Sequence, residues 1–123
     1  MKSLLVLLLL LATPIRALPA EPPAGAKAEI GQLLSALGAS QCEFYRNGSW
    51  HSAADAQAHL TKKYEYLLDK GKISTTERFI ADGGSKSSMS GERYQVRCPD
   101  RPAEPSATWL TNELARLRQK PKQ

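Results

Sequence analysis

Residues 43–63, "EFYRNGSWHSAADAQAHLTKK", hold the local signals that decide the fold. Together with the cysteine that precedes them, residues 42–46 alternate between two faces, which is typical of a short strand. Asn47 and Gly48 come next, and both residue types tolerate the positive φ that a tight turn requires. Ser52 can accept a hydrogen bond from the N–H three residues later, which indicates the start of a helix. The stretch therefore predicts a strand, a tight turn and a helix in close succession.

Apolar residues at helical spacing predict three further helices. In the first of them, Ile30, Leu33, Leu34 and Leu37 fall at i, i+3, i+4 and i+7, and a glycine follows as a natural stop. The four predicted helices run from Ala26 to Leu37, from Ser52 to Gly71, over a short segment that the capping box Ser74–Glu77 opens and Gly83–Gly84 ends, and from a cap at Ser106 onward.

The first twenty residues have the composition of a secretory signal peptide. Lys2 provides a positive start, Leu4–Ala12 is apolar, and small residues suited to cleavage follow at Ala17 and Ala20. The apolar run is about half the length that a bilayer crossing needs, so a retained anchor is the weaker alternative. We therefore expect a periplasmic or secreted chain, with no membrane span after cleavage behind Ala17 or Ala20.

The charge of the chain is modest. There are 17 basic and 12 acidic residues, a net charge of +5, and loss of Lys2 and Arg16 with the signal peptide would leave 15 basic residues and a net charge of +3. The basic residues form small clusters of the kind found on solvated helix faces. A nucleic-acid footprint needs a denser basic stripe, so no nucleic-acid partner is expected.

The chain has two cysteines, Cys42 and Cys98. An even count in a chain bound for an oxidising compartment favours one disulfide. Metal sites and redox dithiols place their cysteines two to four residues apart, whereas these are 56 apart. The disulfide is therefore the favoured interpretation, with a metal pair or a redox dithiol as the alternatives.

A second alternating segment, residues 93–98, predicts a strand that ends at Cys98. Because one cysteine opens the first strand and the other closes the second, a disulfide favours antiparallel pairing. In that register Phe44 faces Val96 and Arg46 faces Tyr94. The predicted fold is therefore a single small α+β domain, with about four helices packed around a short two-stranded antiparallel ribbon and one disulfide. Trp50 is expected to pack over the core.

One row of polar residues on the second helix has no complete structural explanation. Asp55, His59 and Lys63 fall at i, i+4 and i+8, on one line at the edge of the apolar stripe. Asp55 would favour protonation of His59, and Lys63 would oppose it. The row fits either a half-exposed helix flank or a small polar site. His59 and Asp55 have no convincing third partner, so no metal is expected.

The serine loop, Ser85–Gly91, is the second candidate region. A loop rich in hydroxyl groups beside a basic residue could bind a carboxylate, a phosphate or a sugar. Its serines could equally satisfy the backbone of the loop itself. A nucleophilic serine needs a base in contact with it, and neither S-x-x-K nor G-x-S-x-G spacing is present. An enzyme is possible but has no motif in its favour.

The polar segments resemble a family of small exported bacterial proteins known only as domain of unknown function 5329. Its pattern is an aromatic-x-R-N-G turn, an alanine-rich helix with H-L-x-x-K, an E-x-F-I segment, and a serine-rich stretch that ends in [ST]-G-x-x-Y-x-V. The matching residues are Phe44, Arg46, Asn47, Gly48, His59, Leu60, Lys63, Glu77, Phe79, Ile80, Ser85, Ser87, Ser88, Ser90, Gly91, Tyr94 and Val96. The resemblance covers nearly the whole mature chain and implies a periplasmic single-domain protein without an assigned activity.

The predicted organisation is a signal peptide (1–20), an extended lead-in (21–25), one globular domain (26–118) and a basic tail (119–123). The leading functional hypothesis is a non-enzymatic envelope module, without a cofactor, that binds a small anionic or glycan-like ligand or an envelope partner. A serine-dependent hydrolase or transferase and a purely structural protein are the alternatives. The candidate binding residues are Arg46, Asn47, His59, Lys63, Ser85, Ser87, Ser88 and Tyr94.

Overall fold

The computed structural model describes residues 12–15 and 23–120. Most of the expected signal peptide (1–20) and the ends of the expected lead-in and tail lie outside these residues. The elements are α1 (Ala24–Gly38), β1 (Glu43–Arg46), β2 (Ser49–His51), α2 (Ala53–Asp69), α3 (Thr76–Phe79), the π-helical turn η1 (Ile80–Gly84), β3 (Gln95–Arg97), β4 (Glu104–Pro105) and α4 (Ser106–Gln119). No helix in the described ranges is long and apolar enough to cross a membrane.

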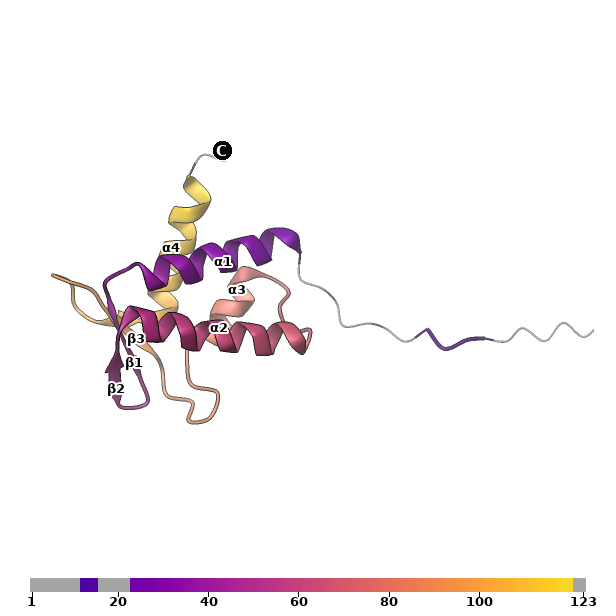
Figure 1. Cartoon of the computed structure of the whole chain (residues 1–123), viewed down its shortest axis with the longest axis horizontal. Coiled ribbons are helices and arrows are strands. Elements are labelled where there is room, and N and C mark those ends of the chain that lie inside the picture. The colour runs from indigo at the N-terminus through magenta and orange to yellow at the C-terminus, as the bar shows by residue number, and fades with distance from the viewer. Residues whose placement is uncertain (1–11, 16–22, 121–123) are drawn as a thin grey trace, which may run out of the picture.

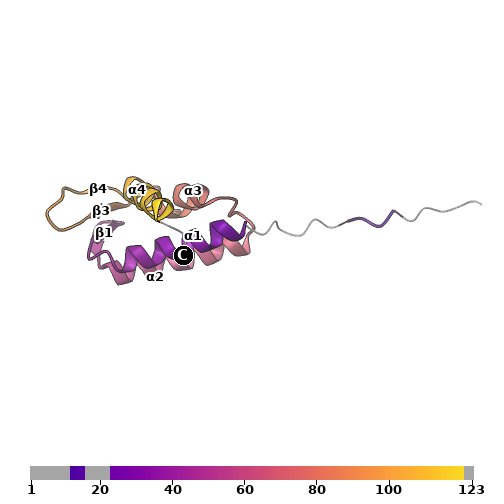
Figure 2. The same ribbon diagram turned by 90° about the horizontal axis from the view of Figure 1, so that it is seen from above.

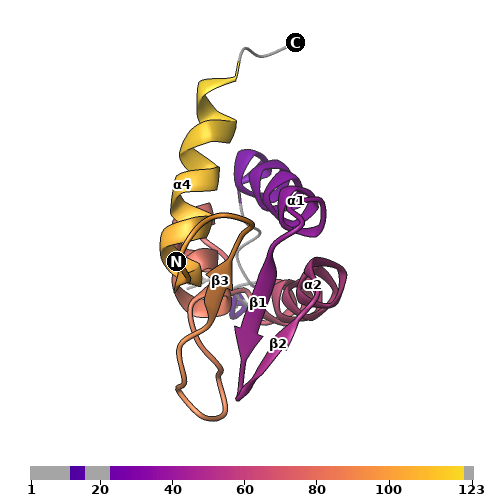
Figure 3. The same cartoon turned by 90° about the vertical axis from the view of Figure 1, so that its left-hand side faces the viewer.

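The chain folds into a small α+β domain, which is the predicted fold class, with the sheet packed against one end of the helices (Figure 1). α1 and α2 run alongside each other, and α4 crosses the end of α1 (Figures 1 and 2). The sheet closes one end of this helical layer, with the helices behind it in Figure 3. α1 begins at Ala24, two residues before its predicted start, and α4 continues through Gln119 into the expected tail.

The sheet has four antiparallel strands in the order β2-β1-β3-β4, so the prediction of a two-stranded ribbon was wrong. The predicted register between β1 and β3 is confirmed, with Phe44 opposite Val96. The chain reverses at Asn47 and Gly48, whose φ angles are 48° and 91°, and returns as β2. β4 has only two residues, one of them Pro105. Both added strands are too short to show an alternating pattern.

The predicted disulfide is confirmed: Cys42 and Cys98 are bonded, with an S–S distance of 2.05 Å. Cys42 comes just before β1 and Cys98 just after β3, so the bond continues the register of the two strands. It joins the end of the sheet that lies away from the Asn47–Gly48 turn.

One continuous core lies between the helices and the inner face of the sheet. α1 supplies the apolar stripe predicted for it, and α4 supplies Trp109 and its leucines. Phe79 is fully buried and meets the ring of Tyr64 edge-on, with 5.6 Å between the ring centres. The largest buried side chains are Phe79, Ile30, Leu33, Leu37, Leu110 and Val96.

Of the three predicted helix caps, one is confirmed. The Ser52 hydroxyl accepts a hydrogen bond from the N–H of Asp55 at 3.1 Å. The cap of α3 is Thr75 and not Ser74, because it is the Thr75 hydroxyl that accepts from the N–H of Arg78. Ser106 does not cap α4 with its side chain; its backbone N–H instead donates to the carbonyl of Tyr94 at 2.9 Å.

Gly83 and Gly84 are the last two residues of η1, so the helical segment that α3 begins ends at the predicted glycines. Their role is close packing. A Cβ on Gly83 would lie 2.9 Å from a ring carbon of Phe79 and 3.3 Å from a methyl group of Leu67. A Cβ on Gly84 would lie 2.5 Å from a methyl group of Leu110.

Gly83→Ala is therefore expected to lower the free energy of unfolding by about 1–3 kcal/mol, because the added methyl group overpacks a rigid, fully buried ring. Gly31→Ala is the matched control, since a Cβ at Gly31 in α1 would meet nothing within 4 Å. We expect the control to raise stability by about 0.5–1 kcal/mol through helix propensity. Urea unfolding measures both values, and equal effects of the two substitutions would contradict the packing role of Gly83.

Candidate functional site

The Arg46 pocket is a small hollow between the β1–β2 hairpin, α2 and Tyr94. Its cavity volume is about 20 Å³, room for about one water molecule. Strand β1 and helix α2 bring most of its walls together, since the hairpin turns directly into the helix. The lining residues are Phe44, Tyr45, Arg46, His51, Asp55, Ala56, His59, Leu60, Tyr94 and Ser106.

The side chains of Lys63, Tyr94 and His59 form a hydrogen-bonded chain, the Tyr94 relay, at one wall of the pocket. Tyr94 and His59 line the pocket, and Lys63 contacts Tyr94 from behind. The Nζ of Lys63 donates to the Tyr94 hydroxyl at 3.2 Å and to the carbonyl of Lys86 at 3.0 Å. The Nε2 of His59 lies 3.2 Å from the same hydroxyl. One turn of α2 separates His59 from Lys63, so both reach the buried Tyr94 from the same helix face.

The chemistry of these groups fixes the direction of the relay. An ammonium group has no acceptor, so Lys63 can only donate to the Tyr94 oxygen. Within the described chain the Tyr94 hydroxyl has no hydrogen-bond partner besides Lys63 and His59. Donation of a hydrogen bond from the Tyr94 hydroxyl to an unprotonated Nε2 of His59 satisfies all three groups without any further partner. We assign His59 as the neutral imidazole with its proton on Nδ1.

Electrostatics favour the same protonation state. Burial, followed by the positive charges of Arg46 and Lys63, lowers the pKa of His59 to about 4. The expected effect of Asp55 in the opposite direction is therefore outweighed. Burial and the charge of Arg46 lower the pKa of Lys63, and burial raises the pKa of Tyr94.

At neutral pH the His59 ring is expected to be uncharged with its proton on Nδ1, and to titrate with a pKa near 4. The ¹⁵N shifts of the ring distinguish the two tautomers, and an NMR pH titration gives the pKa. Tyr94→Phe removes the donor to Nε2 and should abolish the preference for this tautomer. An exposed histidine would instead titrate near its ordinary value of about 6.5, which would contradict the relay.

Arg46 is a basic residue of the pocket that lacks a partner among the described residues. It is half-buried, yet its guanidinium makes no ion pair or hydrogen bond with any residue that the structure describes. No buried side-chain nitrogen or oxygen in the described ranges lacks a hydrogen bond. The unbonded nitrogen atoms of the Arg46 guanidinium must therefore reach solvent, and the same holds for the unbonded Nδ1 of His59. Both groups are accessible donors.

The serine loop lies beside this pocket but does not line it. The Ser90 hydroxyl donates to Oδ1 of Asn47 at 2.8 Å, and Nδ2 of Asn47 lies 3.5 Å from the Ser87 hydroxyl. Ser87 is buried and its hydroxyl accepts from two backbone N–H groups of the loop. The Ser85 hydroxyl donates to the carbonyl of Ile80 at 2.7 Å. These serines mainly hold the loop in shape.

The structure thus brings Arg46, His59, Lys63 and Tyr94 together, with Asn47 as the link to the loop. Ser88 is exposed, makes no side-chain hydrogen bond with the described residues, and is absent from the pocket lining. No serine hydroxyl in residues 23–120 makes a hydrogen bond with the side chain of His59 or Lys63. A serine nucleophile would lack the base that it requires.

Two features of the site were absent from the sequence prediction. These are the lining residues Tyr45 and His51. Only knowledge of β2 could have placed His51 in the pocket. His59 and Asp55 share the pocket, but no three His, Cys, Asp or Glu side chains of the described ranges form a metal-binding group.

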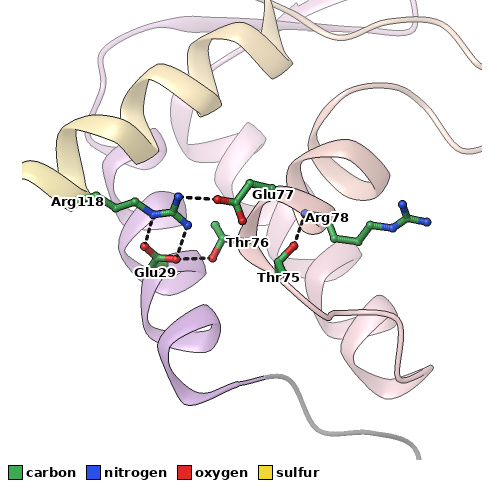
Figure 4. Close-up of polar contacts among 6 residues, drawn as sticks. All are labelled: Glu29, Thr75, Thr76, Glu77, Arg78 and Arg118. Atoms are coloured by element: carbon green, nitrogen blue, oxygen red, sulfur yellow. Dashed lines mark hydrogen bonds and ion pairs between the residues drawn. The ribbon is translucent and has the colours of Figure 1, made fainter.

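A second polar group, the Arg118 cluster, joins three helices away from the pocket (Figure 4). From α4, Arg118 makes two hydrogen bonds to Glu29 of α1, at 2.7 and 3.0 Å, and an ion pair with Glu77 of α3. The buried Thr76 hydroxyl donates to Glu29 at 2.8 Å. These bonds lower the pKa of Glu29 to about 2, with the Arg118 hydrogen bond as the largest cause.

The Arg118 cluster should make stability depend on acid. Glu29 has a pKa of about 2 in the folded chain and an ordinary value of 4.5. Its contribution is therefore complete above pH 4.5 and is lost as the pH falls toward 2. At neutral pH, Glu29→Gln should lower the free energy of unfolding by about 1–2 kcal/mol, and this difference should shrink as the pH falls from 4.5 toward 2. Denaturant unfolding at several pH values tests this, with exposed Glu65→Gln as the control. A constant cost would contradict the ionic role.

Comparison with known proteins gives one match. The model of the family of unknown function DUF5329 matches residues 24–118, which include every described helix and strand except the last residue of α4. No curated protein and no solved structure matches the chain. The predicted family is thereby confirmed, and the chain belongs to DUF5329, a family of unknown function.

Proposed function

We propose that this protein is an exported accessory module of the bacterial envelope that binds the anionic group of a small ligand in the Arg46 pocket. The observation that carries the proposal is the unpaired Arg46 guanidinium on the pocket wall. A half-buried arginine normally finds a carboxylate, because its charge and five donors are costly to leave unmatched. Arg46 has no such partner among the described residues.

The surroundings of Arg46 strengthen its attraction for an anion. The Lys63 ammonium lies behind Tyr94 in the relay, with its Nζ 4.9 Å from the centre of the tyrosine ring. The positive charge of Arg46 already lowers the pKa values of both His59 and Lys63. A bound anion would relieve this repulsion. That relief is a favourable term in binding that an isolated surface arginine cannot supply.

The size of the pocket limits what can enter. A cavity of about 20 Å³ holds one small functional group and cannot enclose a sugar ring. The rest of a ligand would lie over the outer rim, where Asn47 and the serine loop offer amide and hydroxyl groups. This division assigns charge recognition to Arg46 and further contacts to the loop.

Export is supported by the composition of residues 1–20 and by the disulfide, a bond that persists in oxidising compartments. Expression of the full chain in a bacterium, followed by fractionation and intact-mass analysis, tests this part. We expect a periplasmic product that begins at residue 18 or 21 and is two mass units lighter than its reduced form. A cytoplasmic product with two free thiols would contradict it.

The binding proposal is tested by NMR titration of the ¹⁵N-labelled mature protein with acetate, phosphate and sulfate. At least one anion should shift the amide signals of β1 and the first two turns of α2 in a saturable way. Arg46→Gln should weaken that binding about tenfold, since it removes a charged bidentate donor. Arg101→Gln makes the same charge change at an exposed loop and serves as the control. Unsaturable shifts, or equal effects of both variants, would overturn the proposal.

A further inference from the structure

We propose that the Arg46 pocket selects a monocarboxylate carried by a small apolar group, and that Asp55 makes it discriminate against phosphate. This inference rests on the proposed function and specifies its ligand class. Three properties of the pocket carry it: the chemistry of its donors, the charges around it, and the composition of its walls.

The donors suit a carboxylate. Arg46 presents a planar fork that matches two carboxylate oxygens. The Tyr94 relay occupies Nε2 of His59 and leaves its Nδ1–H as a second donor, accessible as argued above. Both donors belong to residues that line the same pocket. Because His59 is neutral, it contributes a hydrogen bond without a charge.

The charge of the pocket matches one negative charge. Arg46 and Asp55 both line it, and they form no ion pair with each other. Lys63 stands behind Tyr94 and adds a second positive charge. Arg46, Lys63 and Asp55 together carry a single net positive charge, and Lys62 adds a weaker positive influence on His59. A carboxylate neutralises this net charge. A phosphate carries about one and a half to two negative charges, and the Asp55 carboxylate would repel the additional negative charge.

The walls favour an apolar neighbour of the carboxylate. Phe44, Ala56 and Leu60 line the cavity beside Arg46. These side chains are almost fully buried and offer no hydrogen bond, so a polar substituent next to the carboxylate would gain no partner from them. The planar carboxylate also suits a space of about 20 Å³ better than the larger, tetrahedral phosphate.

The test compares isobutyrate, its neutral isostere isobutyramide and inorganic phosphate in NMR titrations of the mature protein at constant ionic strength. Isobutyrate should bind at least about tenfold more tightly than the amide, because only the acid satisfies Arg46. It should also bind more tightly than phosphate. N-acetylalanine distinguishes the source of the carboxylate, since tighter binding than that of isobutyrate would indicate a peptide C-terminus and weaker binding a free acid.

Asp55→Asn tests the origin of the selectivity. Removing the negative charge should strengthen phosphate binding about fivefold and change isobutyrate binding less. Asp69→Asn, at the far end of α2, is the matched control and should change neither. If phosphate binds as tightly as isobutyrate to the unaltered protein, or Asp55→Asn leaves phosphate binding unchanged, this inference fails while the proposed function stands. If no anion binds, the proposed function itself fails.

Discussion

Replacing Cys42 and Cys98 together by alanine is expected to lower the free energy of unfolding by about 4 kcal/mol, with the fold retained. The bond closes a loop across a sequence separation of 56 residues. In the chain-entropy model, opening a loop of that length releases about 4 kcal/mol of conformational entropy to the unfolded chain. A domain of this size has a total stability of only about 5–15 kcal/mol, so the loss is a large share.

Urea unfolding of the double variant and of the unaltered protein, each with and without reductant, measures this effect. Reductant should destabilise the unaltered protein to the level of the variant and leave the variant unchanged. The free energy of unfolding should also fall more steeply with urea concentration when the bond is absent, because the unfolded chain then exposes more surface. A double variant that loses less than about 1 kcal/mol would show that strand pairing alone already fixes this end of the sheet.

Phe79→Ala is expected to cost about 3–5 kcal/mol, because Phe79 is fully buried and its loss leaves a cavity that the neighbouring elements cannot fill. The ring lies where three parts of the chain meet. It touches Tyr64 of α2 edge-on, and a Cβ added to Gly83 of η1 would lie 2.9 Å from it. Glycine is present there because the ring leaves no room for a Cβ.

Tyr66→Ala is the matched control, since Tyr66 is an aromatic residue of α2 with 59% of its surface exposed. We expect it to change the free energy of unfolding by less than about 0.5 kcal/mol. Urea unfolding followed by circular dichroism measures both variants. A Phe79→Ala variant within about 1 kcal/mol of the control would mean that the core collapses around the missing ring, contrary to the packing described above.

The regular part of the fold could be predicted from local pattern. Helical spacing located α1, α2 and α4, and the alternation of two short segments with the two cysteines gave the register of β1 and β3. β4 could not be predicted, because a two-residue strand with a proline has no pattern of its own. Trp50 was expected to pack over the core, but its ring meets the ring of Tyr45 edge-on and lies under the guanidinium of Arg97. Its position depends on β2, which no local signal indicated.

The candidate site was predictable where it follows regular geometry. Helical spacing places His59 and Lys63 on one face, and the strand register brings Arg46 to the level of Tyr94. The serines were harder to place, because whether a hydroxyl faces a site or its own loop depends on backbone turns that sequence does not specify. The Arg118 cluster had no local signal at all, since Arg118 and Glu29 are 89 positions apart.

The short outer strands also affect how the protein behaves in concentrated solution. An exposed strand edge can act as a template for another chain, and long flat edges are sites of aggregation. Here one edge of the sheet is β2, with three residues, and the other is β4, with two. Pro105 has no backbone N–H to offer to an incoming strand. Neither edge presents enough unpaired backbone to extend the sheet from one molecule to the next, so the fold resists edge-to-edge association.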